Sequence, residues 1–245
     1  MSARTALVTG GASGIGAACA RELAARGVHV TVADVDEVAA KTLAHDIGGR
    51  AWGVDLLDTD QLDGLRLEVD ILVNNAGIQV VRPIEEFALT DFRRIQTLMV
   101  EAPFLLVKAA LPHMYERGFG RIVNVSSVHG LRASAFKSAY VTAKHGLEGL
   151  SKVTAVEGGP HGVTSNCVNP GYVRTPLVEK QIGDQARVHG IDEERVLADV
   201  LLTEPAIKRL VEPEEVASLV AWLASDDAGM VTGASYTMDG GWTAR

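Results

Sequence analysis

The chain has 245 residues, of which 47% are apolar and 22% are charged, a composition typical of one globular domain with a full core. Its net charge of −8 disfavours a general surface for nucleic acid or anionic membrane. The two cysteines, Cys19 and Cys167, lack metal-ligand or CxxC spacing, so we expect buried thiols in a reducing compartment and no metal site. There is no room for a signal peptide before the first strand and no apolar run of about 18 residues, so we expect a cytoplasmic protein without a membrane span.

Short apolar runs rich in Val and Ile alternate with helical patterns along the chain. The runs are almost continuously apolar, which is typical of parallel strands that are covered on both faces. There are seven such runs, at 5–8, 28–32, 51–54, 71–73, 121–125, 163–168 and 234–238. The alternation predicts an α/β fold: one Rossmann-type domain over 1–245, with a doubly wound parallel sheet of about seven strands and helices on both faces.

Three longer segments have helical patterns. Residues 91–118 predict one long helix, which Pro103 and Pro112 are expected to bend. Residues 134–158 predict a second helix. The polar segment 176–213 follows directly after a strand end, so we expect it to form a helical lid over a ligand crevice.

A glycine-rich turn follows the first strand and opens a helix. Gly10 permits a tight turn, while Gly14 and Gly16 let the backbone approach a phosphate and the helix approach the sheet. The helix N-terminus adds partial positive charge, so the turn predicts a site for a dinucleotide pyrophosphate; the alternative is a plain strand–helix turn. The predicted contacts of this turn are Gly10, Ser13, Gly14, Ile15 and Gly16.

Two aspartates end the next two predicted strands. Asp34 lies eighteen residues after Gly16, where a carboxylate can accept hydrogen bonds from both ribose hydroxyls of an adenosine and would repel a 2′-phosphate. Neither Val35 nor Asp36 could bind that phosphate, so the sequence favours NAD over NADP. Asp55 is a candidate for the adenine amino group. The alternatives are a helix cap or solvated turn residue for Asp34 and a turn aspartate for Asp55.

Ser127, Tyr140 and Lys144 form a candidate catalytic set. Tyr140 and Lys144 are four residues apart in a helical pattern and therefore share a face. An ammonium group beside a phenol favours the phenolate, which a tyrosine with a pKa of about 10 needs in order to act as a base near neutral pH. A base beside a bound nicotinamide could move a hydride to or from an alcohol; the alternative is an ordinary pair on a helix surface.

Over essentially its whole length the chain resembles the short-chain dehydrogenase/reductase family, through segments 9–16, 74–77, 140–144 and 170–175 together with Ser127. The resemblance implies that Tyr140 is the general acid/base. It implies that Lys144 lowers the pKa of Tyr140 and holds the nicotinamide ribose, and that Ser127 hydrogen-bonds the reacting oxygen. Further cofactor contacts are implied for Asn75, Gly77, Val173 and Thr175. The family also implies a homotetramer.

One position departs from the family pattern. Met99 stands five residues before Phe104, where the family usually has an Asn. That Asn holds a distortion of the long helix whose main-chain carbonyl binds a relay water. Met99 keeps the carbonyl but lacks the side-chain bond, so the sequence supports the chemistry of the tyrosine, lysine and serine better than it supports proton exchange with solvent.

Within the family, the chain is most similar to bacterial (R)-3-hydroxybutyrate dehydrogenases, through segments 126–131, 137–140, 143–146, 175–181 and 239–242. In that group four polar side chains hold the substrate carboxylate. Their matches are Gln79, His129, Lys137 and Gln181, with Tyr172 and Trp242 expected at the methyl end. Taken singly, each of these six is also a common loop, helix-surface or core residue.

The resemblance thus implies an NAD-dependent enzyme that interconverts a small hydroxy acid, (R)-3-hydroxybutyrate, and its keto acid, acetoacetate. Two alternatives stay open. The first is another enzyme of the same family, such as a 3-oxoacyl carrier-protein reductase or a sugar or steroid alcohol dehydrogenase. The second is a non-catalytic NAD-sensing protein, for which Met99 is the only support in the sequence.

Overall fold

The structure, a computed structural model, describes residues 3–244 and only the backbone of Lys180. Seven parallel strands form one sheet in the order β3-β2-β1-β4-β5-β6-β7. The strands are β1 (Thr5–Thr9), β2 (His29–Asp34), β3 (Arg50–Gly53), β4 (Ile71–Asn74), β5 (Gly120–Val125), β6 (Val163–Pro170) and β7 (Ser235–Met238). Every predicted run forms a strand, and the doubly wound parallel sheet is confirmed.

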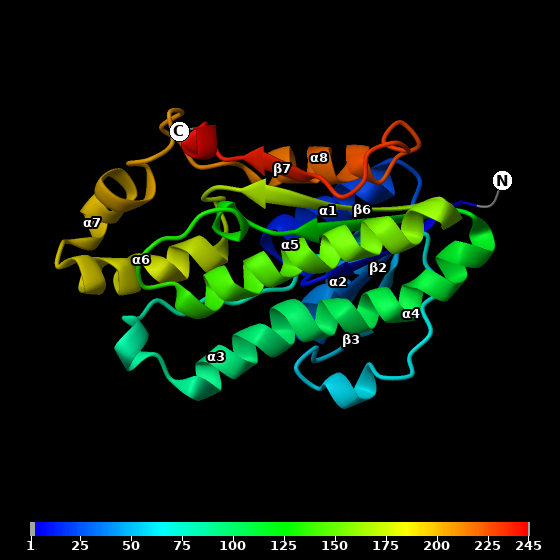
Figure 1. Cartoon of the computed structure of the whole chain (residues 1–245), viewed down its shortest axis with the longest axis horizontal. Coiled ribbons are helices and arrows are strands. Elements are labelled where there is room, and N and C mark those ends of the chain that lie inside the picture. Colours follow the sequence, from blue (N-terminus) through cyan, green and yellow to red (C-terminus); the bar gives the residue numbers. More distant parts are fainter. Residues whose placement is uncertain (1–2, 245) are drawn as a thin grey trace.

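Helices cover both faces of the sheet. They are α1 (Gly14–Ala25), α2 (Glu37–Asp46), α3 (Leu89–Gln96), α4 (Ala102–Arg117), α5 (Ser138–Gly158), α6 (Pro176–His189), α7 (Glu193–Val196) and α8 (Pro213–Leu223). α1, α2 and α8 pack on one face, and α4 and α5 pack on the other (Figure 1). Along β1, Val8 belongs to the first core and Leu7 to the second, because successive strand residues point to opposite faces.

The long predicted helix begins at Leu89 and ends at Arg117, with a π-helical segment, Thr97–Glu101, between α3 and α4. There the Ala102 N–H donates to the carbonyl of Thr97, five residues back. The irregularity therefore precedes Pro103, and Pro112 lies within α4. Met99 is buried in the π-helical segment, so this helix distortion forms without an Asn side chain at that position.

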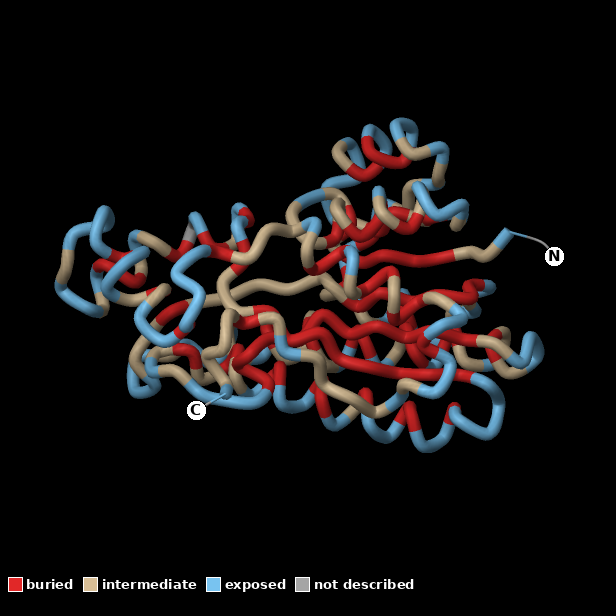
Figure 2. Tube along the Cα trace, turned by 90° about the horizontal axis from the view of Figure 1, so that it is seen from above, coloured by how far each residue is buried: buried red, intermediate tan, exposed pale blue. Residues whose placement is uncertain are grey.

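The same segment, Leu89–Arg117, is long and apolar enough to cross a membrane by length and composition, with a mean hydropathy of 1.3 in its most apolar window. Half of that window is buried in the fold, where α4 packs against α5, β4 and β5. A core helix of a globular domain has these same properties. Figure 2 shows that the buried residues run along the central strands and the inner sides of the helices.

The second predicted helix begins at Ser138, four residues later than the pattern indicated. Phe136 has φ 68, a left-handed conformation that does not continue into a helix. Lys137 then occupies the N-cap position of α5, and only 2% of it is exposed. The shorter helix therefore leaves a loop that delivers Lys137 into the interior.

The segment 176–213 is helical over most of 176–201, whereas 202–212 are irregular. It contains α6, α7 and a second π-helical segment, Leu197–Leu201, and it continues into α8. Figure 1 shows α6 and α7 beyond the ends toward which the strand arrows of β6 and β7 point. These helices thus lie at the carboxyl edge of the sheet, where ligands bind in doubly wound folds.

Candidate active site

A cleft of about 470 Å³ follows the carboxyl ends of the strands. Most of the residues predicted for a cofactor line it: Gly10, Ser13, Gly14, Ile15, Asp34, Asp55, Asn75, Gly77, Tyr140, Lys144 and Thr175. Two predicted residues do not. Gly16 packs beneath the glycine turn, and Val173 lines a neighbouring cavity.

The glycine turn has the shape that its sequence predicted. Gly10 and Gly14 have φ of 57° and 50°. A Cβ on Gly16 would lie 2.1 Å from the carbonyl oxygen of Gly10, so a side chain cannot be accommodated there. α1 begins at Gly14 without a side-chain cap and without an acidic residue in its first turn. Its free N–H groups therefore suit an anionic group such as a pyrophosphate.

Asn75 holds the turn in place. Its Nδ2 donates to the carbonyl oxygens of Thr9 at 2.9 Å and Gly10 at 3.1 Å, so both amide hydrogens are used within the protein. The hydroxyl of Thr9 in turn accepts from the backbone N–H groups of Asn75 and Ala76. Asn75 thus shapes the cleft by joining β4 to the turn after β1.

The two aspartates lie at the cleft with fixed carboxylates. Oδ2 of Asp34 accepts from the backbone N–H of Ala12, and Oδ1 accepts from that of Asp36, both at 3.0 Å. Each oxygen keeps a lone pair for a further donor, so Asp34 can still accept from a ribose. Oδ1 of Asp55 accepts from the backbone N–H of Leu57 at 2.9 Å, a turn-forming bond of the kind its alternative interpretation predicted.

The candidate catalytic set lies where the cleft meets a smaller cavity: Tyr140 and Lys144 line the cleft, and Ser127 and Tyr140 line the cavity. Ser127 follows β5, and its Oγ accepts from the backbone N–H of His129 at 3.2 Å. Burial raises the pKa of Tyr140 to about 12, while a hydrogen bond with Ser127 acts in the opposite direction. Nζ of Lys144 lies 5.5 Å from the centroid of the Tyr140 ring and donates to the carbonyl oxygen of Val125 at 2.6 Å.

The expected lowering of the Tyr140 pKa is therefore not present in the chain alone. Burial affects both members of the pair: it raises the pKa of Tyr140 and lowers that of Lys144 to about 8. The ammonium group is directed at Val125 instead of the phenol oxygen. Tyr140 is therefore protonated near neutral pH in the chain alone.

His129 joins two serines. Its Nδ1 lies 3.3 Å from Oγ of Ser127, and its Nε2 lies 3.0 Å from Oγ of Ser134. Burial, together with the charges of Lys137 and His145, lowers the pKa of His129 to about 3, so the ring is neutral and carries one proton. Ser134 was expected to begin the second helix, but it lies in the loop before α5 and reaches His129 from there.

A smaller cavity of about 60 Å³ adjoins the cleft and shares Ile15, Tyr140 and Thr175 with it. Of the residues predicted for the substrate, it is lined by Gln79, Ser127, His129, Lys137, Tyr140, Tyr172 and Gln181. Nζ of Lys137 donates to the hydroxyl of Tyr172 at 2.9 Å. Burial lowers the pKa of Lys137 to about 7.

The two glutamines that line this cavity differ in which amide atom lacks a partner: a donor in Gln79 and an acceptor in Gln181. Nε2 of Gln79 and Oε1 of Gln181 are buried and have no hydrogen-bond partner among the described residues. Nε2 of Gln181 donates to the carbonyl oxygen of Leu177 one turn back on α6, at 2.9 Å. Gln79 thus offers a free donor, whereas Gln181 has to rotate its amide before it can donate to a carboxylate.

Trp242 lies behind Tyr172. Their rings stack at 5.9 Å between centroids, and the edge of Trp242 meets His129 at 5.5 Å. Trp242 lines a second cavity, of about 480 Å³, which also borders Lys137 and Tyr172. It supports the wall that Tyr172 forms, while the smaller cavity itself is lined by Tyr172.

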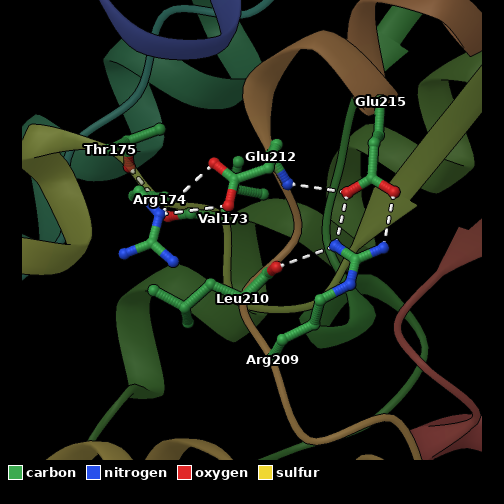
Figure 3. A network of polar contacts seen from close by, with 7 residues as sticks. All are labelled: Val173, Arg174, Thr175, Arg209, Leu210, Glu212 and Glu215. Atoms are coloured by element: carbon green, nitrogen blue, oxygen red, sulfur yellow. Dashed lines mark hydrogen bonds and ion pairs between the residues drawn. The ribbon is translucent and has the colours of Figure 1, made fainter.

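The two ends of the segment 176–213 are tied together (Figure 3). Before α6, the backbone N–H of Arg174 donates to the carbonyl oxygen of Val211, and its guanidinium pairs with Glu212 at 3.1 Å. Before α8, Arg209 forms two hydrogen bonds with Glu215, which also accepts from the backbone N–H of Glu212 (Figure 3). The helices between these ties therefore project from a fixed base.

Within residues 3–244, no group of three or more His, Cys, Asp or Glu side chains is placed to hold a metal ion. Cys19 and Cys167 are both buried as free thiols.

The chain is similar to known proteins over nearly its whole length. A family model described as Enoyl-(Acyl carrier protein) reductase matches residues 10–243. A D-beta-hydroxybutyrate dehydrogenase of Rhizobium meliloti is 44% identical over 99% of each chain, and one of Cupriavidus necator is 40% identical over 100% of each. A solved structure titled short chain dehydrogenase/reductase family protein superposes with a TM-score of 0.85 at 36% identity, covering 98% of this chain and 97% of the other.

Proposed function

Since the chain belongs to the short-chain dehydrogenase/reductase family, we propose that it is an NAD-dependent dehydrogenase that interconverts (R)-3-hydroxybutyrate and acetoacetate. That it is an oxidoreductase of this family rests on full-length similarity at 40–44% identity. The cofactor, the substrate and the roles of individual residues are the proposed part.

The observation that carries the substrate proposal is the position of Lys137. This lysine is only 2% exposed, and none of the ion pairs found in the described part of the chain includes it. It borders the same small cavity as Ser127 and Tyr140, where Nε2 of Gln79 is an unused buried donor. A buried amine and an unpaired amide are costly unless a ligand completes them, and a small carboxylate does so.

The cleft fits a nicotinamide dinucleotide, and three features support NAD in particular. The uncapped start of α1 suits the pyrophosphate. Asp34 would accept from the adenosine ribose, and its charge would repel the 2′-phosphate of NADP. Lys144 and Thr175 would lie along the nicotinamide end of the cleft. When bound, the cofactor supplies the acceptor or donor of the hydride.

The side chains divide the remaining work. Lys137 and Gln79 bind the carboxylate and so orient a substrate that has few other groups. Ser127 and Tyr140 hold the 3-hydroxyl group, and Tyr140 takes its proton during oxidation. Lys144, together with the positive charge that the oxidised cofactor brings, stabilises the phenolate that burial opposes. His129 fixes the position of Ser127 through its ring and its backbone N–H.

The proposal includes the lid and the assembly. Segment 176–213 closes over the substrate from its tied base, and closure lets Gln181 turn its amide toward the carboxylate. Tyr172, backed by Trp242, packs beside the methyl end. We place the enzyme in the cytoplasm as a homotetramer that needs no nucleic acid or membrane partner, in line with its net charge of −8.

The first test is NAD reduction at 340 nm with (R)- and (S)-3-hydroxybutyrate, with NADP and a 3-hydroxyacyl thioester in parallel. Turnover selective for the (R) acid and for NAD supports the proposal. Preference for NADP and the thioester would identify a carrier-protein reductase instead, and turnover of uncharged alcohols alone would point to a sugar or steroid dehydrogenase. Tight NADH binding without turnover of any substrate would indicate a sensor.

A further inference from the structure

A buried carboxylate lies one helical turn after Lys144. Glu148 is only 4% exposed, although it lies in the middle of α5. Because residues four apart share a helix face, Lys144 and Glu148 both face the sheet, where α5 packs against β6. The catalytic scheme above gives Glu148 no role, and a charged side chain is seldom buried without a partner.

Both oxygens of Glu148 act as hydrogen-bond acceptors, as in a carboxylate. Oε1 accepts from Nδ2 of Asn169 at 2.5 Å, and Oε2 accepts from the hydroxyl of Ser235 at 2.6 Å. Asn169 belongs to β6 and Ser235 to β7. Glu148 therefore ties the catalytic helix to the last two strands of the sheet.

The same network reaches the turn that carries the catalytic serine. Nδ2 of Asn169 also donates to the main-chain carbonyl of Ser127 at 2.9 Å. A Cβ added to Gly130 would lie 2.9 Å from Oε1 of Glu148 and 2.5 Å from Oγ of Ser126, so the turn packs directly on the carboxylate. Glu148 thus lies one helical turn from Lys144 and is joined to the main chain of Ser127 through Asn169.

The groups around Lys144 differ in charge. Burial lowers its pKa to about 8, and Cys167 and Glu148 oppose that change. Burial raises the pKa of the Cys167 thiol, so Cys167 is neutral at physiological pH. Tyr140 on α5 is also neutral in the chain alone, and β5 contributes only the carbonyl of Val125. Among these neighbours, Glu148 is the one that supplies negative charge.

We propose that Glu148 is a positioning residue of the active site: its buried carboxylate stabilises the ammonium group of Lys144 one helical turn away, and its hydrogen bond with Asn169 holds the Ser127 turn. This rests on the function proposed above for Tyr140 and Lys144. The supporting carboxylate thus lies on the same helix as the lysine, four residues farther along the chain.

The test is Glu148→Gln in the full chain, with the side-chain pKa of Lys144 measured by NMR on protein labelled with ¹³C-lysine and assigned with Lys144→Met. Gln keeps the shape: its oxygen can accept from Asn169 and its amide can donate to Ser235. We expect the pKa of Lys144 to fall by about one pH unit. The alkaline limb of the activity profile should move down by the same amount.

The matched control is Ser235→Ala, which removes one hydrogen bond and leaves the charge. There the pKa of Lys144 should stay within a few tenths of the wild-type value. An unchanged pKa in folded Glu148→Gln, or an equal shift in both variants, overturns the proposal. If the Gln variant does not fold, Glu148→Asp draws the charge back by one methylene and should give a smaller downward shift; no shift would count against the proposal.

The lysine titration needs neither substrate nor cofactor. If the wild-type protein fails to oxidise (R)-3-hydroxybutyrate while the Lys144 pKa still depends on Glu148, the substrate proposal is wrong and this one stands. If turnover occurs and the pKa does not depend on Glu148, the reverse holds.

Discussion

Two lysines lie seven residues apart at the start of α5, and both are almost completely buried. Lys144 has a carboxylate, Glu148, that opposes the effect of burial on its pKa, and its Nζ donates to a main-chain carbonyl. Lys137 has burial alone acting on its pKa, and its Nζ donates to the hydroxyl of Tyr172. Neither lysine belongs to an ion pair found among the described residues, but a carboxylate one helical turn away raises the pKa of Lys144, whereas no such group acts on Lys137.

The difference separates a group that serves the reaction from a group that binds a ligand. The carboxylate of Glu148 stabilises the ammonium group of Lys144 whether or not substrate is present, which suits a lysine that supports Tyr140. A buried amine without a counter-ion costs folding free energy, and it gains a partner when an anion enters the cavity. Lys137 therefore has the properties expected of a group that binds a carboxylate. The predictions below test whether Lys144 serves the reaction and Lys137 serves binding.

The largest effect is expected at the reacting pair. Lys144→Met should lower kcat by roughly 10²- to 10⁴-fold, because the phenolate of Tyr140 loses its supporting charge. Tyr140→Phe should lose a similar factor, and the double variant should lose little more, since the two residues act as a unit. Steady-state kinetics on the three proteins measures this. A Tyr140→Phe enzyme that kept most of its turnover would refute the mechanism.

The second prediction concerns binding by Lys137. Lys137→Met should raise KM for 3-hydroxybutyrate by roughly 10²-fold, because the carboxylate loses a buried charged donor, and should change kcat much less. Arg132→Met is the matched control, since Arg132 is an exposed cation on the second cavity and should alter KM little. If Lys137→Met lowered kcat and left KM unchanged, the separation between the two lysines would be wrong.

A pH dependence follows from the lowered pKa of Lys137, which is about 7. A carboxylate binds the protonated amine, so KM should be flat below pH 7 and rise above it by up to about tenfold per pH unit. Lys137→Met should abolish this rise. Initial rates between pH 6 and 9 at saturating cofactor measure it; a KM that stays constant in the wild-type enzyme would mean that the lysine charge is not used.

Much of the fold could be predicted because it depends on local patterns. The run Ile71–Leu72–Val73 has only apolar residues and forms part of a fully buried strand. In the first turn, Gly10 and Gly14 have positive φ angles, a conformation that glycine adopts most easily. The pair Tyr140 and Lys144 could be predicted from spacing alone, since a helix places them on one face.

Features that depend on tertiary contacts could not be predicted in the same way. The start of α5 moves to Ser138 because Phe136 adopts a left-handed conformation, which its residue type does not favour. The orientation of Gln181 is set by a carbonyl on its own helix, and the neutrality of His129 follows from burial. Glu148 did leave a signal: a charged residue four positions after Lys144, on the buried face.

The smallest predicted effect is on stability, and it should be larger at Lys137 than at Lys144. The folded-state pKa of Lys137 is about 7, below its ordinary value of 10.5, so the unfolded chain binds more protons between these values and stability rises with pH there. Lys137→Met removes a penalty that is complete below pH 7, and should raise the Tm of ligand-free protein by several degrees at pH 6 and by less at pH 9.

Lys144→Met should raise the Tm by less, because the folded-state pKa of Lys144 is about 8, closer to its ordinary value, so the penalty that burial imposes is smaller. Thermal unfolding of both variants by circular dichroism compares the two shifts. Equal shifts would mean that the two lysines are buried in equivalent surroundings. A larger gain for Lys137→Met would show that the burial of Lys137 is less compensated within the fold than that of Lys144.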